Sequence, residues 1–275
     1  MTERLLPLLV EPAELEQQLT NPRLLLVDMS SAQGNTIGHI PGAVQLDFPD
    51  LVLAKPPIMG LIPEEADLTA LFSKLGLTPE SHVVAYDDER NGRASRFLWT
   101  LDAIGHFDYS LLNGGLRAWW AEQRPLESVA RAPVASTYQA ELRNPAARAD
   151  RDYILRHLDD DRTLVLDVRS PAEYSGEDVR ALRGGHIPGA VNFEWTQAMD
   201  ADNYMRLLPP AELRALLEAR GITPDKAIIT HCQSHLRAAH TYIVLKSLGY
   251  PDVRGYDGAW SEWGNKPDLP VEADL

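Results

Sequence analysis

The only cysteine of the chain, Cys232, lies where one sequence pattern ends and another begins. Residues 226–230 (Lys-Ala-Ile-Ile-Thr) form a short β-favouring run, which predicts a strand, and residues 237–249 have apolar side chains at helical spacing before a terminal glycine. Cys232 is therefore expected just past the carboxyl end of a strand and just before a helix. Ligands of open parallel sheets bind at this edge. Free cysteine is also among the most often buried residues, so position, more than residue type, favours a nucleophile over a packing role.

The loop Cys-Gln-Ser-His-Leu-Arg that follows the strand is suited to hold a reactive sulfur. Its backbone N–H groups and the positive end of the next helix favour a thiolate over a thiol, and Arg237 adds positive charge, as His231 and His235 do when protonated. We expect the loop to form a substrate-binding cradle, with Arg237 closing its mouth and His235 facing solvent at the entrance. The predicted cradle residues are Gln233, Ser234, His235, Leu236 and Arg237.

The positions around this loop occur twice in the chain. The segment Gly-His-Ile-Pro-Gly-Ala-Val stands at 38–44 and again at 185–191, and residues 76–87 have a counterpart at 221–232 in the same order. A repeat of this length indicates duplicated domains, not a solenoid of short units. Within it, His39 and His186 are expected to be turn or packing residues.

Each repeat alternates short β-branched runs with segments of helical period, which predicts an α/β fold with a mainly parallel sheet flanked by helices. The predicted strands are Leu24–Val27, Val83–Tyr86, Leu164–Leu166 and Ala227–Thr230. The Ala-, Arg- and Pro-rich segment between the repeats is weakly periodic and predicts a connector. The predicted division is a first domain at 1–128, a linker at 129–150 and a second domain at 151–275.

Alignment of the repeats places Asp87 where Cys232 stands. The first loop offers carboxylates in place of a thiol and positive charge, so it is suited neither to bind an anion nor to act as a sulfur nucleophile. We therefore expect the first domain to be catalytically silent and the second to be active.

The doubled D-x-x-S and Gly-His-Ile-Pro-Gly-Ala motifs and the single loop cysteine resemble the two-domain rhodaneses, which are thiosulfate sulfurtransferases. The resemblance covers essentially the whole chain. The loop is most similar to that of a bacterial subgroup with Cys-Gln-Thr-His-His-Arg in this place. Gln233 and Ser234 replace the basic residues of the mammalian-type loop, and Glu173 stands where those enzymes carry an arginine, so their anion-binding residues do not transfer to this chain.

The resemblance implies covalent double displacement. The Cys232 thiolate attacks the outer sulfur of thiosulfate, sulfite leaves, and the resulting persulfide passes its sulfur to cyanide or a thiol. No cofactor is implied beyond this covalent intermediate. The implied partners are a small sulfur donor and a thiophilic acceptor, and the family resemblance suggests a monomer.

Three other functions are weighed against this one. A 3-mercaptopyruvate sulfurtransferase would resemble Cys-Gly-Ser-Gly at the loop, which is absent. A cysteine phosphatase or arsenate reductase needs one more residue between cysteine and arginine, because a tetrahedral phosphate ester requires a wider loop. A non-catalytic sulfur carrier or regulatory module is consistent with the silent first domain, but the intact second loop argues against it.

Several residues outside the loop are candidates for supporting roles. Asp167 ends the first strand of the second domain and is a candidate substrate-binding residue. A scaffold role, in which it holds loop backbone or nearby arginines, is favoured because Asp28 repeats it in the first domain. Trp195 follows the repeated turn and is expected either to wall the pocket, with cation–π contact to an arginine, or to pack between the domains. Trp119 and Trp263 recur and predict core positions. Three arginines are candidates to steer the donor anion, with surface charge as the alternative, namely Arg169, Arg180 and Arg183.

Composition limits the classes of function. The formal net charge of −14 argues against sequence-independent binding to nucleic acid or to anionic membranes. No apolar run approaches the roughly 20 residues of a membrane span, and no secretory signal is predicted, so the expected location is the cytoplasm. One cysteine excludes a disulfide framework and a multi-cysteine metal site, and no metal is expected.

Overall fold

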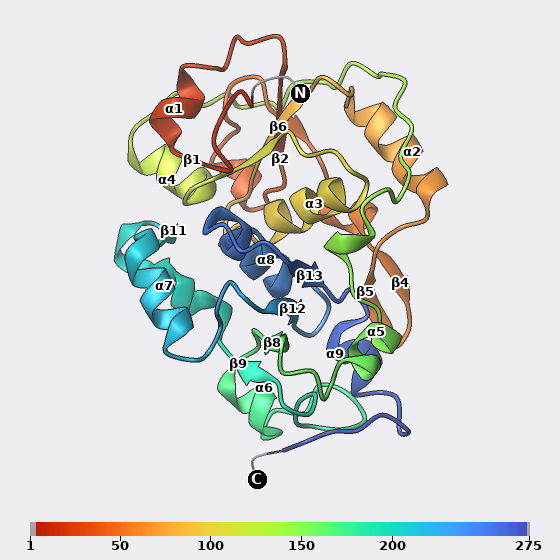
Figure 1. Ribbon diagram of the computed structural model, residues 1–275. Helices are drawn as coiled ribbons and strands as arrows, with labels where there is room; N and C mark the ends of the chain where they lie inside the picture. Colours follow the sequence, from red (N-terminus) through yellow and green to blue (C-terminus); the bar gives the residue numbers. More distant parts are fainter. Residues whose placement is uncertain (1–3, 274–275) are drawn as a thin grey trace. The chain divides into compact units, whose positions relative to one another are not determined.

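The computed structural model describes residues 4–273, and in it the two repeats fold as separate α/β units (Figure 1). Of the described residues, the first unit comprises 4–51, 63–144 and 200–207, and the second comprises 52–62, 145–199 and 208–273. The predicted connector thus divides at residue 144, and its only regular element is the 3₁₀ helix η3 at Pro145–Ala147.

The first unit is built on one parallel sheet with the strand order β1-β7-β6-β2-β3. Its strands are β1 Leu9–Val10, β2 Leu24–Asp28, β3 Val44–Gln45, β6 His82–Tyr86 and β7 Tyr109–Leu112. Its helical elements are α1 Pro12–Glu16, η1 Gly34–Thr36, η2 Phe48–Leu51, α2 Glu65–Leu75, α3 Gly92–Ala103, α4 Gly115–Ala121 and η5 Ala201–Asn203. The short strand β11 at Arg206–Leu207 also belongs to it.

The second unit repeats this design with the parallel order β13-β12-β8-β9. Its strands are β8 Thr163–Asp167, β9 Val191–Asn192, β12 Ala227–His231 and β13 Val253–Gly255. Its helical elements, besides η3, are α5 Arg151–Arg156, α6 Pro171–Ser175, η4 Trp195–Ala198, α7 Pro210–Glu218, α8 Arg237–Ser247 and α9 Ala259–Trp263. The antiparallel hairpin of β4 Leu53–Lys55 and β5 Ile58–Leu61 comes from the first repeat but packs in this unit. The two-residue strand β10 at Met199–Asp200 pairs with β11.

The predicted strands and the fold class are confirmed. Each predicted run lies within β2, β6, β8 or β12, and the central pair has the same register in both units: Asp28 faces Tyr86, and Asp167 faces His231. This register places Asp87 and Cys232 at equivalent positions, one residue past the strand end.

Repeated residues outside the sheets have the predicted structural roles. Trp119 and Trp263 are fully buried in the apolar core of their own unit. Their indole Nε1 groups donate to the carbonyls of Pro125 and Pro270 at 2.8 Å in both cases. Among residues 4–273, no helix is both long and apolar enough to cross a bilayer.

Candidate active site

Cys232 lies at the strand-to-helix junction that the sequence predicts. It follows the last residue of β12, and α8 begins after the loop at Arg237. The Cys232 side chain is 1% exposed and is not part of a disulfide. Because β12 is a central strand of a parallel sheet, its carboxyl end is the edge where such sheets bind ligands.

Neighbouring elements fix the backbone of the loop. The first turn of α9 supplies two N–H donors: Trp260 donates to the carbonyl of Cys232 at 2.8 Å, and Ser261 donates to that of Gln233 at 3.0 Å. The side-chain amide of Gln233 donates to the carbonyl of Arg180 at 3.1 Å. The loop is therefore anchored to segments on either side of it and is not a free surface turn.

The guanidinium of Arg237 is held by a carboxylate on α6. Its two Nη atoms donate to Glu173 at 2.6 and 2.8 Å, and Glu173 itself is 1% exposed. Burial opposes ionisation, but the hydrogen bonds and charge of Arg237 lower the pKa of Glu173 from 4.5 to about 2. The side chain of Cys232 is a second partner of Arg237. Burial lowers the pKa of Arg237, but the hydrogen bonds and charge of Glu173 and the contact with Cys232 outweigh burial and raise it. Arg237 thus places positive charge at the sulfur of Cys232, and the carboxylate of Glu173 partly neutralises that charge.

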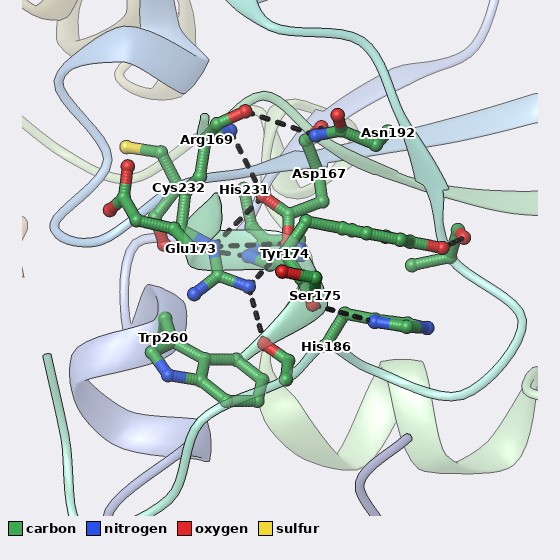
Figure 2. A network of polar contacts seen from close by, with 12 residues as sticks. Asp167, Arg169, Glu173, Tyr174, Ser175, His186, Asn192, His231, Cys232 and Trp260 are labelled. Carbon is green, nitrogen blue, oxygen red and sulfur yellow. Dashed lines mark hydrogen bonds and ion pairs between the residues drawn. The ribbon is translucent and has the colours of Figure 1, made fainter. Parts of the chain in front are cut away.

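Asp167 and Arg169 form a second buried ion pair (Figure 2). Its carboxylate accepts from Nε of Arg169 at 3.0 Å and from Nη2 at 2.6 Å, and the same guanidinium lies 4.4 Å from the ring centroid of Trp260. Burial favours the neutral acid, yet the positive charge and the hydrogen bonds of Arg169 hold the pKa of Asp167 below its usual value. Asp167 thus holds Arg169 in place, and its part in substrate binding stays a prediction. In the first unit Asp28 binds Tyr86 and His39 at 2.8 Å in the same place.

The histidine before the nucleophile position carries no charge at neutral pH. Burial lowers the pKa of His231 from 6.5 to about 4, and its Nε2 lies 3.5 Å from the carboxylate of Asp167. Arg237 is therefore the positive group next to Cys232, and His231 adds none at pH 7.

In the first unit the equivalent loop holds a carboxylate in a ring of backbone N–H groups. Asp87 accepts hydrogen bonds from Glu89 at 2.9 Å, Asn91 at 2.8 Å, Arg93 at 3.0 Å and Ala94 at 3.2 Å. This loop type thus directs successive N–H groups at an anionic atom placed one residue after the strand. Asp87 occupies those donors with its own side chain.

Two expectations about the loop are wrong. His235 does not face solvent: it is fully buried, because the residue takes a left-handed conformation with φ of 59° and its side chain lies within the protein. Trp195 makes no cation–π contact with an arginine within residues 4–273. It is half-buried and meets the ring of His240 edge-on at 5.4 Å.

Of the three arginines considered for anion steering, two have structural roles. Arg169 is buried in its ion pair with Asp167, and Arg183 donates to the backbone carbonyls of Trp263, Lys266 and Leu269. Arg180 keeps half of its side chain exposed while lying near Glu173 and Asp178. It is the member of the three that is available to solvent. The remaining predicted loop residues, Ser234 and Leu236, are half-buried, and Leu236 caps α8.

The sequence did not reveal the roles of Glu173 and Gly60. Ser170 and Glu173 form the capping box of α6, a signal readable from Ser-Pro-Ala-Glu, but not the ion pair with Arg237. Gly60 lies in the β4–β5 hairpin, where a built Cβ would be 2.2 Å from the carbonyl oxygen of Ser234. The hairpin thus packs directly against the Cys232 loop, and no local pattern in the sequence predicts that contact.

Comparison with known proteins agrees with this architecture. The model of the Rhodanese-like domain matches the chain twice, at residues 11–122 and 150–266, so the chain belongs to the rhodanese family, with two copies of the domain. A thiosulfate sulfurtransferase of Azotobacter vinelandii is 50% identical over 267 residues, which cover 97% of each chain. A thiosulfate sulfurtransferase of Pseudomonas aeruginosa is 49% identical with the same coverage. The crystal structure of the 3-mercaptopyruvate sulfotransferase SseA from Escherichia coli superposes with a TM-score of 0.83 at 30% identity, covering 92% of this chain and 99% of that one.

Proposed function

We propose that this protein is a thiosulfate sulfurtransferase whose nucleophile is Cys232. The observation that carries the proposal is the position of the single cysteine, at the carboxyl end of β12 with its side chain against Arg237. Two relatives named for this activity, at 50% and 49% identity over nearly the whole chain, support thiosulfate as the donor.

The chemistry follows from that placement. The thiolate of Cys232 attacks the outer sulfur of thiosulfate, the S–S bond breaks, and sulfite leaves with the electron pair. A persulfide remains on the enzyme. Cyanide or a thiol then attacks the terminal sulfur and releases the Cys232 thiolate, so neither a metal nor an organic cofactor is required.

The cradle would stabilise both anionic forms of the sulfur. Asp87 supports this reading, because the equivalent loop of the first unit directs four backbone N–H groups at one carboxylate. A thiolate or persulfide at Cys232 would accept the same kind of bonds, with Arg237 as a side-chain donor. We propose Gln233, Ser234 and Leu236 as the rest of the cradle.

Mass spectrometry tests this proposal. Intact mass is measured on reduced protein before and after thiosulfate, and again after cyanide, with Cys232→Ser as the matched variant. We expect the wild type alone to gain one sulfur atom and to lose it to cyanide with release of thiocyanate. Loading of Cys232→Ser would overturn the site assignment.

Failure of the wild type to take up sulfur would overturn thiosulfate as the donor. Loading by 3-mercaptopyruvate in its place would favour the activity for which the Escherichia coli structure is named. Loading by neither donor would favour a non-catalytic binding module. The monomeric state, the cytoplasmic location and the absence of nucleic-acid partners stay predictions of the sequence.

A further inference from the structure

The first unit contains a cavity of about 880 Å³ far from its Asp87 loop. Pro79 and Asp108, which line it, lie shortly before β6 and β7, whereas Asp87 follows β6. The cavity is therefore at the amino ends of the parallel strands, on the sheet edge opposite to the Asp87 loop. Its volume is in the range of sites that bind small molecules, roughly 300–1,000 Å³.

Flat rings form part of its wall. Phe107 lines the cavity and is 53% exposed, so its ring is accessible from solvent. His106 and Tyr138 meet edge-to-face at 6.2 Å. Burial lowers the pKa of His106, so this ring is neutral at pH 7, and its Nε2 is bonded to the carbonyl of Ser81. The rings of Phe107, His106 and Tyr138 are suited to pack against a planar ring of a ligand.

Two arginines supply positive charge in the same lining. Arg4 donates to the carbonyl of Phe107 at 2.8 Å and forms no ion pair with a carboxylate of residues 4–273. Arg143 uses its Nε for Glu141 at 3.1 Å, which leaves its Nη groups for another acceptor. The one lining carboxylate, Asp108, is paired with Arg23 at 3.4 Å. In a chain of net charge −14, such a local excess of guanidinium groups favours an anion.

The second unit shows that the fold alone does not produce a large cavity with an excess of positive charge. It has a hollow at the same edge of its sheet, next to the starts of β8 and β12, but the volume there is about 300 Å³. Its lining carboxylates, three aspartates, outnumber its cations, Arg162 and Lys226. The two copies of the domain thus differ in both size and charge at equivalent places.

We propose that the first unit binds a small planar aromatic anion, a ring carrying a carboxylate, sulfonate or phosphate, in this cavity. The ring packs against Phe107 and Tyr138, and the anionic group is bound by Arg4 and Arg143. The site is separate from Cys232 and does not depend on sulfur transfer. It assigns a ligand-binding role to the unit whose loop carries Asp87 where the other carries cysteine.

A fluorescence titration of the full chain tests the proposal, with anilinonaphthalene sulfonate as the anionic probe and N-phenylnaphthylamine as its neutral counterpart. We expect one saturable site for the sulfonate. The double variant Arg4→Ala/Arg143→Ala should weaken its binding about tenfold or more, because charge-assisted hydrogen bonds are lost, while the neutral probe is unaffected. Phe107→Ala should weaken the binding of both probes.

The matched control is Arg162→Ala/Lys226→Ala, which removes the two cations from the corresponding hollow of the second unit and should leave the sulfonate affinity unchanged. Circular dichroism verifies that each variant is folded. Equal affinity in wild type and Arg4→Ala/Arg143→Ala, or absence of saturable binding, would contradict the proposed site.

Discussion

At the scale of single residues, the charge beside Cys232 is set by a carboxylate outside the loop. Glu173 binds both Nη atoms of Arg237, so the cation nearest the sulfur is not a free anion-binding group. The guanidinium of Arg237 is held in place beside the sulfur of Cys232, and Glu173 partly neutralises its charge. Glu173 is therefore a positioning residue that acts through Arg237.

We predict that Glu173→Gln destabilises the protein in a pH-dependent manner. The change should lower the free energy of unfolding at pH 7 by about 2 kcal/mol, less than for a fully buried pair because 19% of the Arg237 side chain is exposed. The pKa of Glu173 is about 2 in the folded protein against 4.5 ordinarily, so its contribution is complete above about pH 4.5 and declines as the pH falls toward 2.

Urea denaturation of wild type and variant at pH 7 and pH 3.5 measures this difference, with the exposed Glu177→Gln as control. The gap between wild type and Glu173→Gln should narrow at the lower pH. A gap that stays constant, or one that Glu177→Gln reproduces, would contradict the assigned ion pair.

At the scale of elements, the same strand–loop–helix motif has a different role in each of the two units. In both units a central parallel strand ends, a loop of five residues follows, and a helix begins. With Asp87 the N–H groups of the turn are satisfied internally, and the loop is a structural feature. With Cys232 the same position holds a side chain able to react.

We predict that Asp87→Ala affects stability and not catalysis. Four buried or partly buried N–H groups lose their acceptor, which should lower the free energy of unfolding by about 2 kcal/mol. The rate of sulfur transfer should stay within about twofold of wild type, since the site is in the other unit. Thermal denaturation and a thiocyanate assay measure the two quantities.

Asp87→Asn is the matched control, because it keeps one oxygen to accept these bonds and should be destabilised less than Asp87→Ala. A loss of about a hundredfold in rate would show that the first unit is not silent in catalysis. Unchanged stability would instead contradict the role of Asp87 in the loop.

At the scale of the whole molecule, the compact units are not the two halves of the chain. Residues 52–62 of the first repeat fold with the second unit, and residues 200–207 of the second repeat fold with the first. Within the second unit, β5 and the residue after it contact α9 and the segment before it: the backbone N–H of Met59 donates to Ser261 at 3.2 Å, and that of Ile62 donates to Asp257 at 2.9 Å. The hairpin thereby completes the surroundings of the Cys232 loop.

We predict that Gly60→Ala impairs sulfur transfer although residue 60 lies far from Cys232 in sequence. The added Cβ would be 2.2 Å from the carbonyl oxygen of Ser234, so the loop backbone has to move. A shift on the order of 1 Å in a reacting group can reduce the rate about a hundredfold, and we expect at least about a tenfold loss. The neighbouring Met59→Ala, at a side chain 48% exposed, is the control and should keep its rate. Full activity in Gly60→Ala would refute the role of the hairpin.

The sequence by itself determined the duplicated α/β fold, the strands β2, β6, β8 and β12, and the strand-end position of Cys232. These features follow from periodicity and repetition, which are properties of neighbouring residues along the chain. Only the tertiary structure decided that Glu173 neutralises Arg237 from 64 residues away, that His235 is buried, and that a hairpin of the first repeat packs on the loop of the second. Contacts of that kind depend on how separate segments pack against one another, and no local pattern of polarity or turn residues encodes which segments will meet.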